Sequence, residues 1–115
     1  MNSKVKGKFF EDYTLSLLEK EGFQLVRRNH RVPGAEIDLI MHKGGKFYLI
    51  EVKYRNYPIE FDHVGSYLRK QYFRLRKAKI YLLKCTNFQA IFESWLFLYM
   101  KKNKKMLILK RLKLY

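Results

Sequence analysis

Two hydrophobic runs rich in β-forming residues lie at positions 35–43 and 46–55, and Gly44 and Gly45 separate them. Glycine supplies the positive φ angles that a tight two-residue turn needs, so the pattern predicts a β-hairpin. With both glycines in the turn, Lys43 faces Lys46, and all further pairs follow the same register. The rest of the chain is interpreted around this hairpin.

The predicted register gathers three acidic residues and one lysine on one patch. Asp38 lies opposite Glu51, and Glu36 lies opposite Lys53. Opposed residues have Cβ atoms roughly 5 Å apart, and like charges in that position destabilise a sheet. A divalent cation would stabilise the patch, because Mg²⁺ binds carboxylate oxygens together with water. The alternative is an exposed hairpin face whose charges pair across the strands.

Helical periodicity predicts a first helix from Asn2 or Ser3 to about Lys20, with Gly22 as its stop. Its apolar stripe comprises Val5, Phe9, Tyr13 and Leu17, widened by Phe10 and Leu18. Glu11 lies off this stripe, so the pattern alone makes it a solvated helix residue.

A second helix is predicted from about Val64 to Lys84. Its apolar positions follow a four-then-three spacing at Val64, Leu68, Leu75, Ala78 and Leu82. Gln71 occupies the missing position of that series. A polar amide on a core-facing stripe breaks the local rule, and such breaks often mark functional sites. The alternative is a core amide that hydrogen-bonds to the backbone.

The remaining segments complete a predicted order α-β-β-β-α-β-β, an α/β domain with a mixed central sheet flanked by the two helices. Residues 23–29 predict a strand, 29–34 a polar turn, and 56–63 a mobile loop. Residues 87–100 predict a strand covered on both faces, 101–105 a cationic turn, and 106–109 a final strand. The basic segment 105–115 is left open between a flexible tail and a segment that follows nucleic acid.

Length and composition are those of one domain, residues 1–115. Hydrophobic residues make up 48% of the chain, without a run of the ~18 apolar residues that a membrane span needs. The first residues do not form a signal peptide, and the single cysteine, Cys85, fits a reducing compartment. A cytoplasmic location is therefore expected. His30, His42 and His63 lack the spacing of zinc ligands.

The net charge of +15 is unevenly distributed. Residues 1–63 hold 11 Lys and Arg against 9 Asp and Glu, whereas residues 64–115 hold 14 against Glu93 alone. The potential metal ligands thus lie in the first part and the positive field in the second. Such a field favours polyanions, because neutralised phosphates release counterions. An anionic membrane surface is the competing partner.

An ordered set of motifs resembles the YraN-like family of bacterial proteins. The motifs are Gly7-x-x-x-Glu11, Asn29-x-Arg31, Glu36-Ile-Asp-Leu-Ile40, Glu51-Val-Lys-Tyr-Arg55, and Lys70-Gln71 with Ala78. Asp38 followed by Glu51-Val52-Lys53 is similar to the core of the PD-(D/E)XK nuclease superfamily, and the family is similar to archaeal Holliday junction resolvases. The resemblance covers residues 7 to 83, although Gly34-Ala35 stands where the family has a glycine before its E-I-D motif.

The resemblance implies a restriction-endonuclease-like core and a role for each matching residue. Asp38, Glu51 and Glu11 would hold Mg²⁺ or Mn²⁺, and Lys53 would complete the catalytic set. Glu36 and Gln71 would support the site as second-rank residues. The residues expected to contact nucleic acid are Arg31, Arg55, Lys70, Arg74 and Lys77.

The sequence therefore predicts a metal-dependent, nuclease-like protein that hydrolyses DNA phosphodiesters, with branched or structured DNA implied by the resemblance alone. The alternative is a non-catalytic nucleic-acid-binding protein that keeps the nuclease fold. An adaptor that binds an acidic protein is a third hypothesis. The choice between DNA and RNA, and the formation of a homodimer, stay open.

Overall fold

The computed structural model describes residues 3–56, 61–87, 89–104 and 106–114 of the chain. In chain order the elements are α1 (Ser3–Lys20), β1 (Gln24–Val32), β2 (Ala35–Lys43), β3 (Lys46–Asn56), α2 (Phe61–Cys85), β4 (Phe92–Asn103) and β5 (Met106–Lys113). This order confirms the predicted α-β-β-β-α-β-β arrangement.

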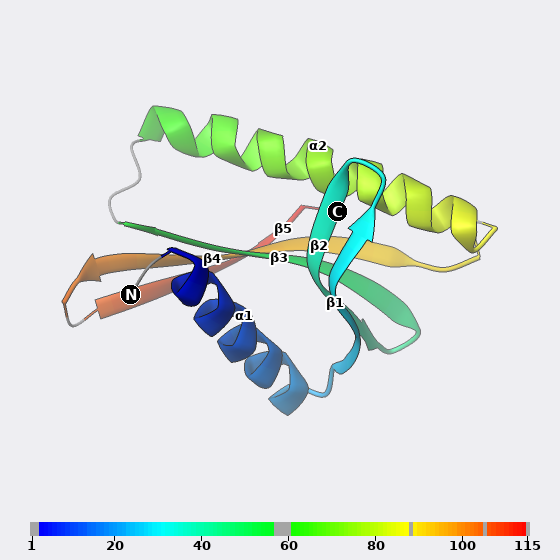
Figure 1. The fold of residues 1–115 in the computed structure, drawn as a ribbon, viewed down its shortest axis with the longest axis horizontal. Coiled ribbons are helices and arrows are strands. Elements are labelled where there is room, and N and C mark those ends of the chain that lie inside the picture. Colours follow the sequence, from blue (N-terminus) through cyan, green and yellow to red (C-terminus); the bar gives the residue numbers. More distant parts are fainter. Residues whose placement is uncertain (1–2, 57–60, 88, 105, 115) are drawn as a thin grey trace.

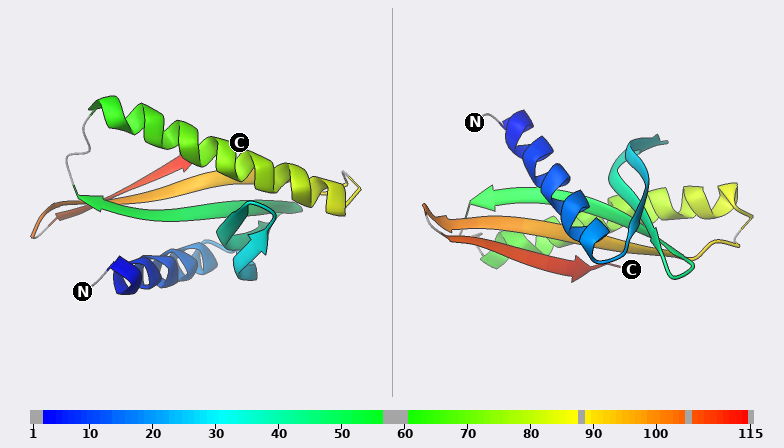
Figure 2. Two further views of the ribbon diagram at one scale, coloured as in Figure 1. Left: turned by 45° about the horizontal axis from the view of Figure 1, so that its top comes forward. Right: turned by 90° about the horizontal axis from the view of Figure 1, so that it is seen from below.

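The five strands form one mixed sheet in the order β1-β2-β3-β4-β5 (Figure 1). Neighbouring strands run antiparallel except β3 and β4, which are parallel. Two parallel strands need a crossover connection, and α2 supplies it. The two helices lie on opposite sides of the sheet (Figure 2). Among the described residues, no helix is long and apolar enough to cross a membrane.

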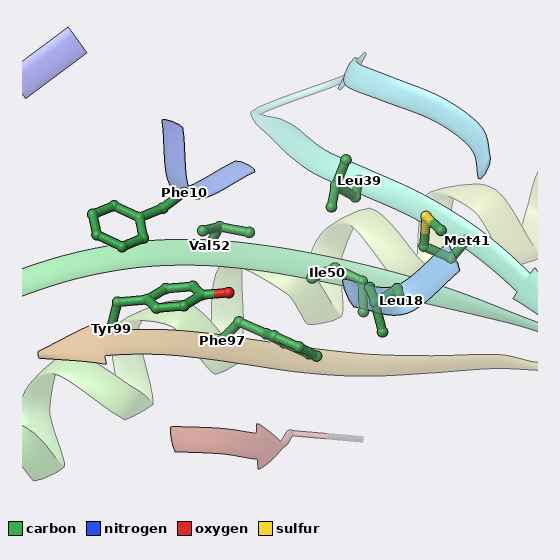
Figure 3. Packing of buried hydrophobic residues seen from close by; sticks show 8 residues of the cluster. All are labelled: Phe10, Leu18, Leu39, Met41, Ile50, Val52, Phe97 and Tyr99. Atoms are coloured by element: carbon green, nitrogen blue, oxygen red, sulfur yellow. The ribbon is translucent and has the colours of Figure 1, made fainter. Parts of the chain in front are cut away.

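The core on the α1 side of the sheet joins α1 to the three central strands. Its buried members are Phe10, Leu18, Leu39, Met41, Ile50, Val52, Phe97 and Tyr99 (Figure 3). Phe97 and Tyr99 alternate along β4 with Leu96 and Leu98, which are buried in a separate cluster with Leu68 of α2 packed against it. Both faces of β4 are therefore covered, as its apolar alternation predicts.

The stripe predicted for α2 is confirmed wherever its side chains are described. Gln71, Leu75 and Ala78 are buried, with Leu68 and Leu82 partly buried beside them. Leu75 and Ala78 pack with residues of β1, β2, β3 and β4. The side chain of Val64 lies outside the described set. The sequence periodicity thus identified the buried face of this helix.

The stripe predicted for α1 is wrong along its central line of Val5, Phe9 and Tyr13, and right in Phe10 and Leu18, which widen it. The helix buries Phe10, Thr14 and Leu18, whereas Phe9 and Tyr13 are each 52% exposed. The reason is the polar residue in the middle of the buried face. The Thr14 hydroxyl donates to the carbonyl of Phe10 at 2.7 Å and shares a 2.6 Å hydrogen bond with the Tyr99 hydroxyl. A satisfied threonine can occupy a core position that a count of apolar residues assigns to the solvent.

The helix end and the hairpin turn are as predicted. After α1, the amide of Phe23 donates to the carbonyl of Leu18 at 3.0 Å around Gly22, whose φ is +93°. Gly44 and Gly45 have φ values of 59° and 78°, and Lys43 pairs with Lys46. Both turns need backbone conformations that favour glycine.

The register between β2 and β3 holds as far as Leu39 opposite Ile50 and then ends in the described residues. Neither Asp38 with Glu51 nor Glu36 with Lys53 continues this pairing, so the prediction that each of these two pairs lies directly opposed is wrong. On the other edge of β2, Glu36 pairs with Arg31 of β1. The sequence did not indicate that β2 would leave β3 while remaining paired with β1. The two central strands separate at the point where the acidic residues begin.

Three boundaries also differ from the predictions. β1 continues to Val32, with Asn29 inside it at a φ of 48°, so the predicted polar turn is confined to Pro33 and Gly34. Residues 106–113, within the segment left open as a tail, form β5 and pair with β4. The Arg111 guanidinium also donates two 2.8 Å hydrogen bonds to Glu21. α2 begins at Phe61, inside the loop predicted for residues 56–63, and residues 57–60 of that loop lie outside the described residues.

Candidate active site

The site begins where β2 and β3 separate. There the backbone amide of Val52 donates a 2.8 Å hydrogen bond to Oδ2 of Asp38 rather than to a backbone carbonyl of β2. A carboxylate thus satisfies an amide that the interrupted strand pairing leaves open. The contact holds the Asp38 side chain beside β3, where its negative charge raises the pKa of Glu51.

Glu51 is the most buried charged residue of the site, with 1% of its surface exposed. Its Oε1 lies 3.2 Å from Nζ of Lys53 and 2.7 Å from Nη2 of Arg74. Its Oε2 is buried and receives no hydrogen bond from any donor in the described residues. A buried carboxylate oxygen without a donor is costly, and a proton or a cation beside it would offset that cost.

Arg74 of α2 contacts both strands that form the site. Besides its bond to Glu51, it donates a 3.2 Å hydrogen bond to the backbone carbonyl of Glu36. The sequence placed Arg74 among the residues that contact nucleic acid, and the structure places it against the carboxylates. Arg74 lies three residues after Gln71, so both side chains lie on the same face of the helix. This spacing could have indicated from the sequence that Arg74 faces the site.

Glu11 reaches the site from α1 on the other side of the sheet. Its side chain is 19% exposed and lies 3.9 Å from Arg28 of β1, which donates a 2.6 Å hydrogen bond to Asp12. Glu11 is therefore no ordinary solvated helix residue. The negative charge of Asp38 acts on it across the gap between the strands.

Burial and mutual repulsion raise the carboxyl pKa values of this cluster. Burial, followed by the charge of Asp38 and opposed by Arg28, raises the pKa of Glu11 from 4.5 to about 7. The same two causes raise the pKa of Glu51, against the opposing charges of Lys53 and Arg74. Burial raises the pKa of Asp38, although the Val52 amide opposes the shift. Without a cation, the cluster therefore retains protons up to near-neutral pH.

The other predicted residues lie around this cluster or away from it. Gln71 is 5% exposed, and its Oε1 has no hydrogen-bond partner in the described part of the chain. Glu36 turns toward β1, with Oε2 3.5 Å from Nε of Arg31. The remaining predicted contacts to nucleic acid are all exposed: Arg31, Arg55, Lys70 and Lys77.

The residues present suit a hard divalent cation held by few ligands. Across the described residues, no group of three His, Cys, Asp or Glu side chains converges as a complete metal centre. Mg²⁺ does not need one, because it commonly binds through one or two carboxylates and keeps several waters. Asp38 and Glu51 supply such a pair, and the Glu51 oxygen that lacks a donor is a ligand without a competing hydrogen bond.

Residues 10–106 match the uncharacterised protein family UPF0102. The chain belongs to this family. It is 39% identical to a UPF0102 protein of Shewanella loihica over 86 residues, which are 75% of each chain. It is 36% identical to a UPF0102 protein of Lachnoclostridium phytofermentans over 84 residues, 72% of this chain and 71% of that protein. The YraN-like resemblance is thereby confirmed at the level of the family.

Removal of Arg74 tests whether this UPF0102 chain depends on the arginine to neutralise Glu51. Arg74→Met is expected to lower Tm in EDTA by roughly 5–10 °C, because a buried carboxylate loses its shortest charged hydrogen bond. Lys77→Met, an exposed position on the same helix, is the matched control and should change Tm by less than about 2 °C. Equal melting of the two variants would contradict the assigned contact.

Proposed function

We propose that this protein is a metal-dependent nuclease that hydrolyses DNA phosphodiesters. The observation that supports the proposal most strongly is the hydrogen bond that holds Asp38 at the amide of Val52, next to Glu51, whose buried Oε2 lacks a donor among the described residues. A buried carboxylate with a second, partly buried carboxylate nearby weakens a fold unless a cation neutralises them. The pattern of Asp38, Glu51 and Lys53 adds the resemblance to the PD-(D/E)XK nucleases.

Each residue has a role that its surroundings support. Asp38 and Glu51 would hold Mg²⁺ or Mn²⁺, and Glu11, which does not converge with them among the described residues, would join them only when the ion is bound. The bound ion would supply Lewis-acid stabilisation of the phosphate and a more acidic water. Lys53 lies beside Glu51 and remains 25% exposed, so its ammonium can both contact the carboxylate and orient a water or neutralise the phosphate.

The second candidate is a non-catalytic nucleic-acid-binding protein with the same fold and charge. Incubation of the pure protein with branched and linear DNA, in Mg²⁺, Mn²⁺ or EDTA, separates the two. Cleavage that requires the metal supports the nuclease. Salt-dependent DNA binding without cleavage supports the second candidate. A cytoplasmic location belongs to the proposal because Cys85 is a free, exposed thiol, which suits a reducing compartment.

The basic surface of α2 predicts a steep salt dependence of DNA binding. The logarithm of the affinity for duplex DNA should fall against the logarithm of salt concentration with a slope of roughly −4 to −8. Lys70→Glu combined with Lys77→Glu should flatten this slope, because both lysines are exposed and lie outside the carboxylate cluster. The same double reversal at Arg27 and Lys46, in the strands, should have a smaller effect. A slope that α2 reversal does not change would exclude this helix from the interface.

A further inference from the structure

A groove of about 1050 Å³ lies between the N-terminal part of α1 and the β1–β2 hairpin. Lys4, Lys8, Phe9 and Glu11 line it from α1, Arg28 lines it from β1, and Glu36 lines it from β2. Figure 2 shows the hairpin standing beside α1 on the same side of the sheet. Within the part of α2 whose side chains the structure describes, residues 68–85, none lines this groove, so these basic residues and the groove are separate surfaces.

The groove leads to the carboxylate cluster. Glu11 lines the groove and is also the carboxyl whose pKa the charge of Asp38 raises. Glu36 lines it as well, and its backbone carbonyl accepts the hydrogen bond from Arg74. A ligand that fills the groove therefore lies against the residues proposed to cleave DNA.

Charge changes sign along the α1 wall of this groove. Lys4 and Lys8 are exposed, one helical turn apart, and form no ion pair within the described part of the chain. Glu11 and Asp12 follow on the next turn, where Arg28 pairs with both. The lysine end suits a phosphate backbone, and the acidic end suits a phosphate only together with a cation. A polyanion bound along this wall would therefore extend from the lysine end to the acidic end.

Phe9 provides an aromatic surface at the edge of the groove. It is 52% exposed, and its ring meets that of Phe10 edge to face, at 5.2 Å between centroids. A second hollow, of about 280 Å³, shares Phe9 with the groove and is also lined by Tyr13 and Lys20. Exposed aromatic rings that alternate with lysines are typical of surfaces on which bases stack.

The spacing of the two rings favours an unpaired strand over a duplex. Phe9 and Tyr13 are four residues apart on α1, which is about 6 Å along a helix axis. Bases stacked in duplex DNA repeat every ~3.4 Å, so successive bases reach both rings only when they are unstacked from each other. A duplex offers base faces only at its ends, whereas a single strand offers each base in turn.

We propose that the groove beside α1 binds an unpaired DNA strand, with a base stacked on Phe9 and the backbone along Lys4 and Lys8. The strand would lead to Asp38 and Glu51, so the proposal rests on the proposed function for what happens to the bound DNA. It assigns the substrate as DNA that contains unpaired nucleotides. Duplex affinity resides mainly in the basic residues of α2.

Phe9→Ala tests the groove by binding alone. In EDTA, where no metal-dependent cleavage occurs, its affinity for a fluorescein-labelled oligothymidylate should fall about 5- to 50-fold, the loss expected for one stacked base. Affinity for a blunt duplex of the same charge should change less than about 2-fold. Phe73→Ala removes an equally exposed phenylalanine, 49% exposed on α2, and is the matched control that should leave the oligothymidylate affinity unchanged.

Phe9→Trp separates loss of stacking from loss of fold. It should restore the affinity of the parent protein, because a larger ring stacks at least as well, and its fluorescence should be quenched by the oligothymidylate. Unchanged single-strand affinity in Phe9→Ala, an equal loss for duplex, or full competition by polyglutamate would overturn the groove proposal. The binding assay needs no catalysis. If the parent protein cleaves no DNA but Phe9→Ala loses single-strand affinity, the groove proposal stands and the nuclease proposal fails. If the parent protein cleaves DNA and Phe9→Ala binds the single strand normally, the nuclease proposal stands and the groove proposal fails.

Discussion

Asp38→Asn and Lys53→Ala are each expected to abolish metal-dependent cleavage while affinity for DNA stays within a few-fold of the parent. Asp38→Asn removes one of the two proposed metal ligands, which should reduce the single-turnover rate about 10³-fold or more. Lys53→Ala removes the ammonium beside Glu51, at an expected cost of about 10²- to 10³-fold. Affinity should persist because the exposed lysines of α2 lie outside the cluster.

The measurement is a cleavage rate and a binding isotherm for each variant under the same salt and Mg²⁺ concentrations. Lys46→Ala is the matched control, since Lys46 lies on the same strand, is 46% exposed and lies 3.9 Å from Glu93. It should cleave at the rate of the parent protein. If Lys53→Ala also cleaves at that rate, Lys53 has no catalytic role and the active-site assignment fails.

Local rules were sufficient for the hairpin and for the buried face of α2. Gly44 and Gly45 define the turn between the strands, and the first pair beyond them fixes the register of the next four. In α2, Leu75 and Ala78 follow the period of the helix toward a large apolar sheet surface. Both predictions depend on residues close together in sequence, so tertiary packing did not change the local preference.

The candidate site depends on two tertiary features that no local sequence pattern contains. Between Leu39 and Ala35, β2 stays paired with β1 but no longer pairs with β3. The backbone amide of Val52 therefore donates its hydrogen bond to the side chain of Asp38. Arg74 reaches Glu51 because α2 crosses over the same gap. The sequence therefore identified the acidic residues of β2 and β3, but it misplaced Glu36 and did not indicate that Arg74 contacts Glu51.

The error in α1 has a more specific cause. Phe9 and Tyr13 are more hydrophobic than Thr14, yet the helix buries Thr14. It does so because the Thr14 hydroxyl hydrogen-bonds to the hydroxyl of Tyr99 in β4, 85 residues away in the sequence. A long-range polar pair cannot be read from one segment. The same pair leaves Phe9 and Tyr13 at the surface, where the groove proposal uses them.

Asp38→Asn is also expected to raise Tm in EDTA at pH 8, by several degrees. The variant removes a charge that raises the pKa values of Glu11 and Glu51, and the asparagine carbonyl can still accept the hydrogen bond from Val52. For Glu11 the pKa is 4.5 when unfolded and about 7 when folded, so the folded state binds more protons between these values. The stabilising contribution of this site is thus complete below pH 4.5 and is lost as the pH rises through 7.

Thermal melts of parent and Asp38→Asn in EDTA, at pH 5 and pH 8 and at low salt, measure this loss. The Tm of the parent should fall more between these pH values than that of the variant. Because both proteins keep the same histidines and the same basic surface, the difference isolates the cluster. The distant positive charges oppose the effect in both proteins and are screened further.

Magnesium should reverse the loss in the parent protein. A ligand that binds only the folded state at ten times its Kd stabilises it by about 1.4 kcal/mol, which corresponds to roughly 5 °C for a domain of this size. With one carboxylate of the pair neutralised, the variant should gain much less at the same Mg²⁺ concentration. A variant that melts below the parent in EDTA, and that responds to Mg²⁺ as the parent does, would mean that Asp38 and Glu51 do not share a cation.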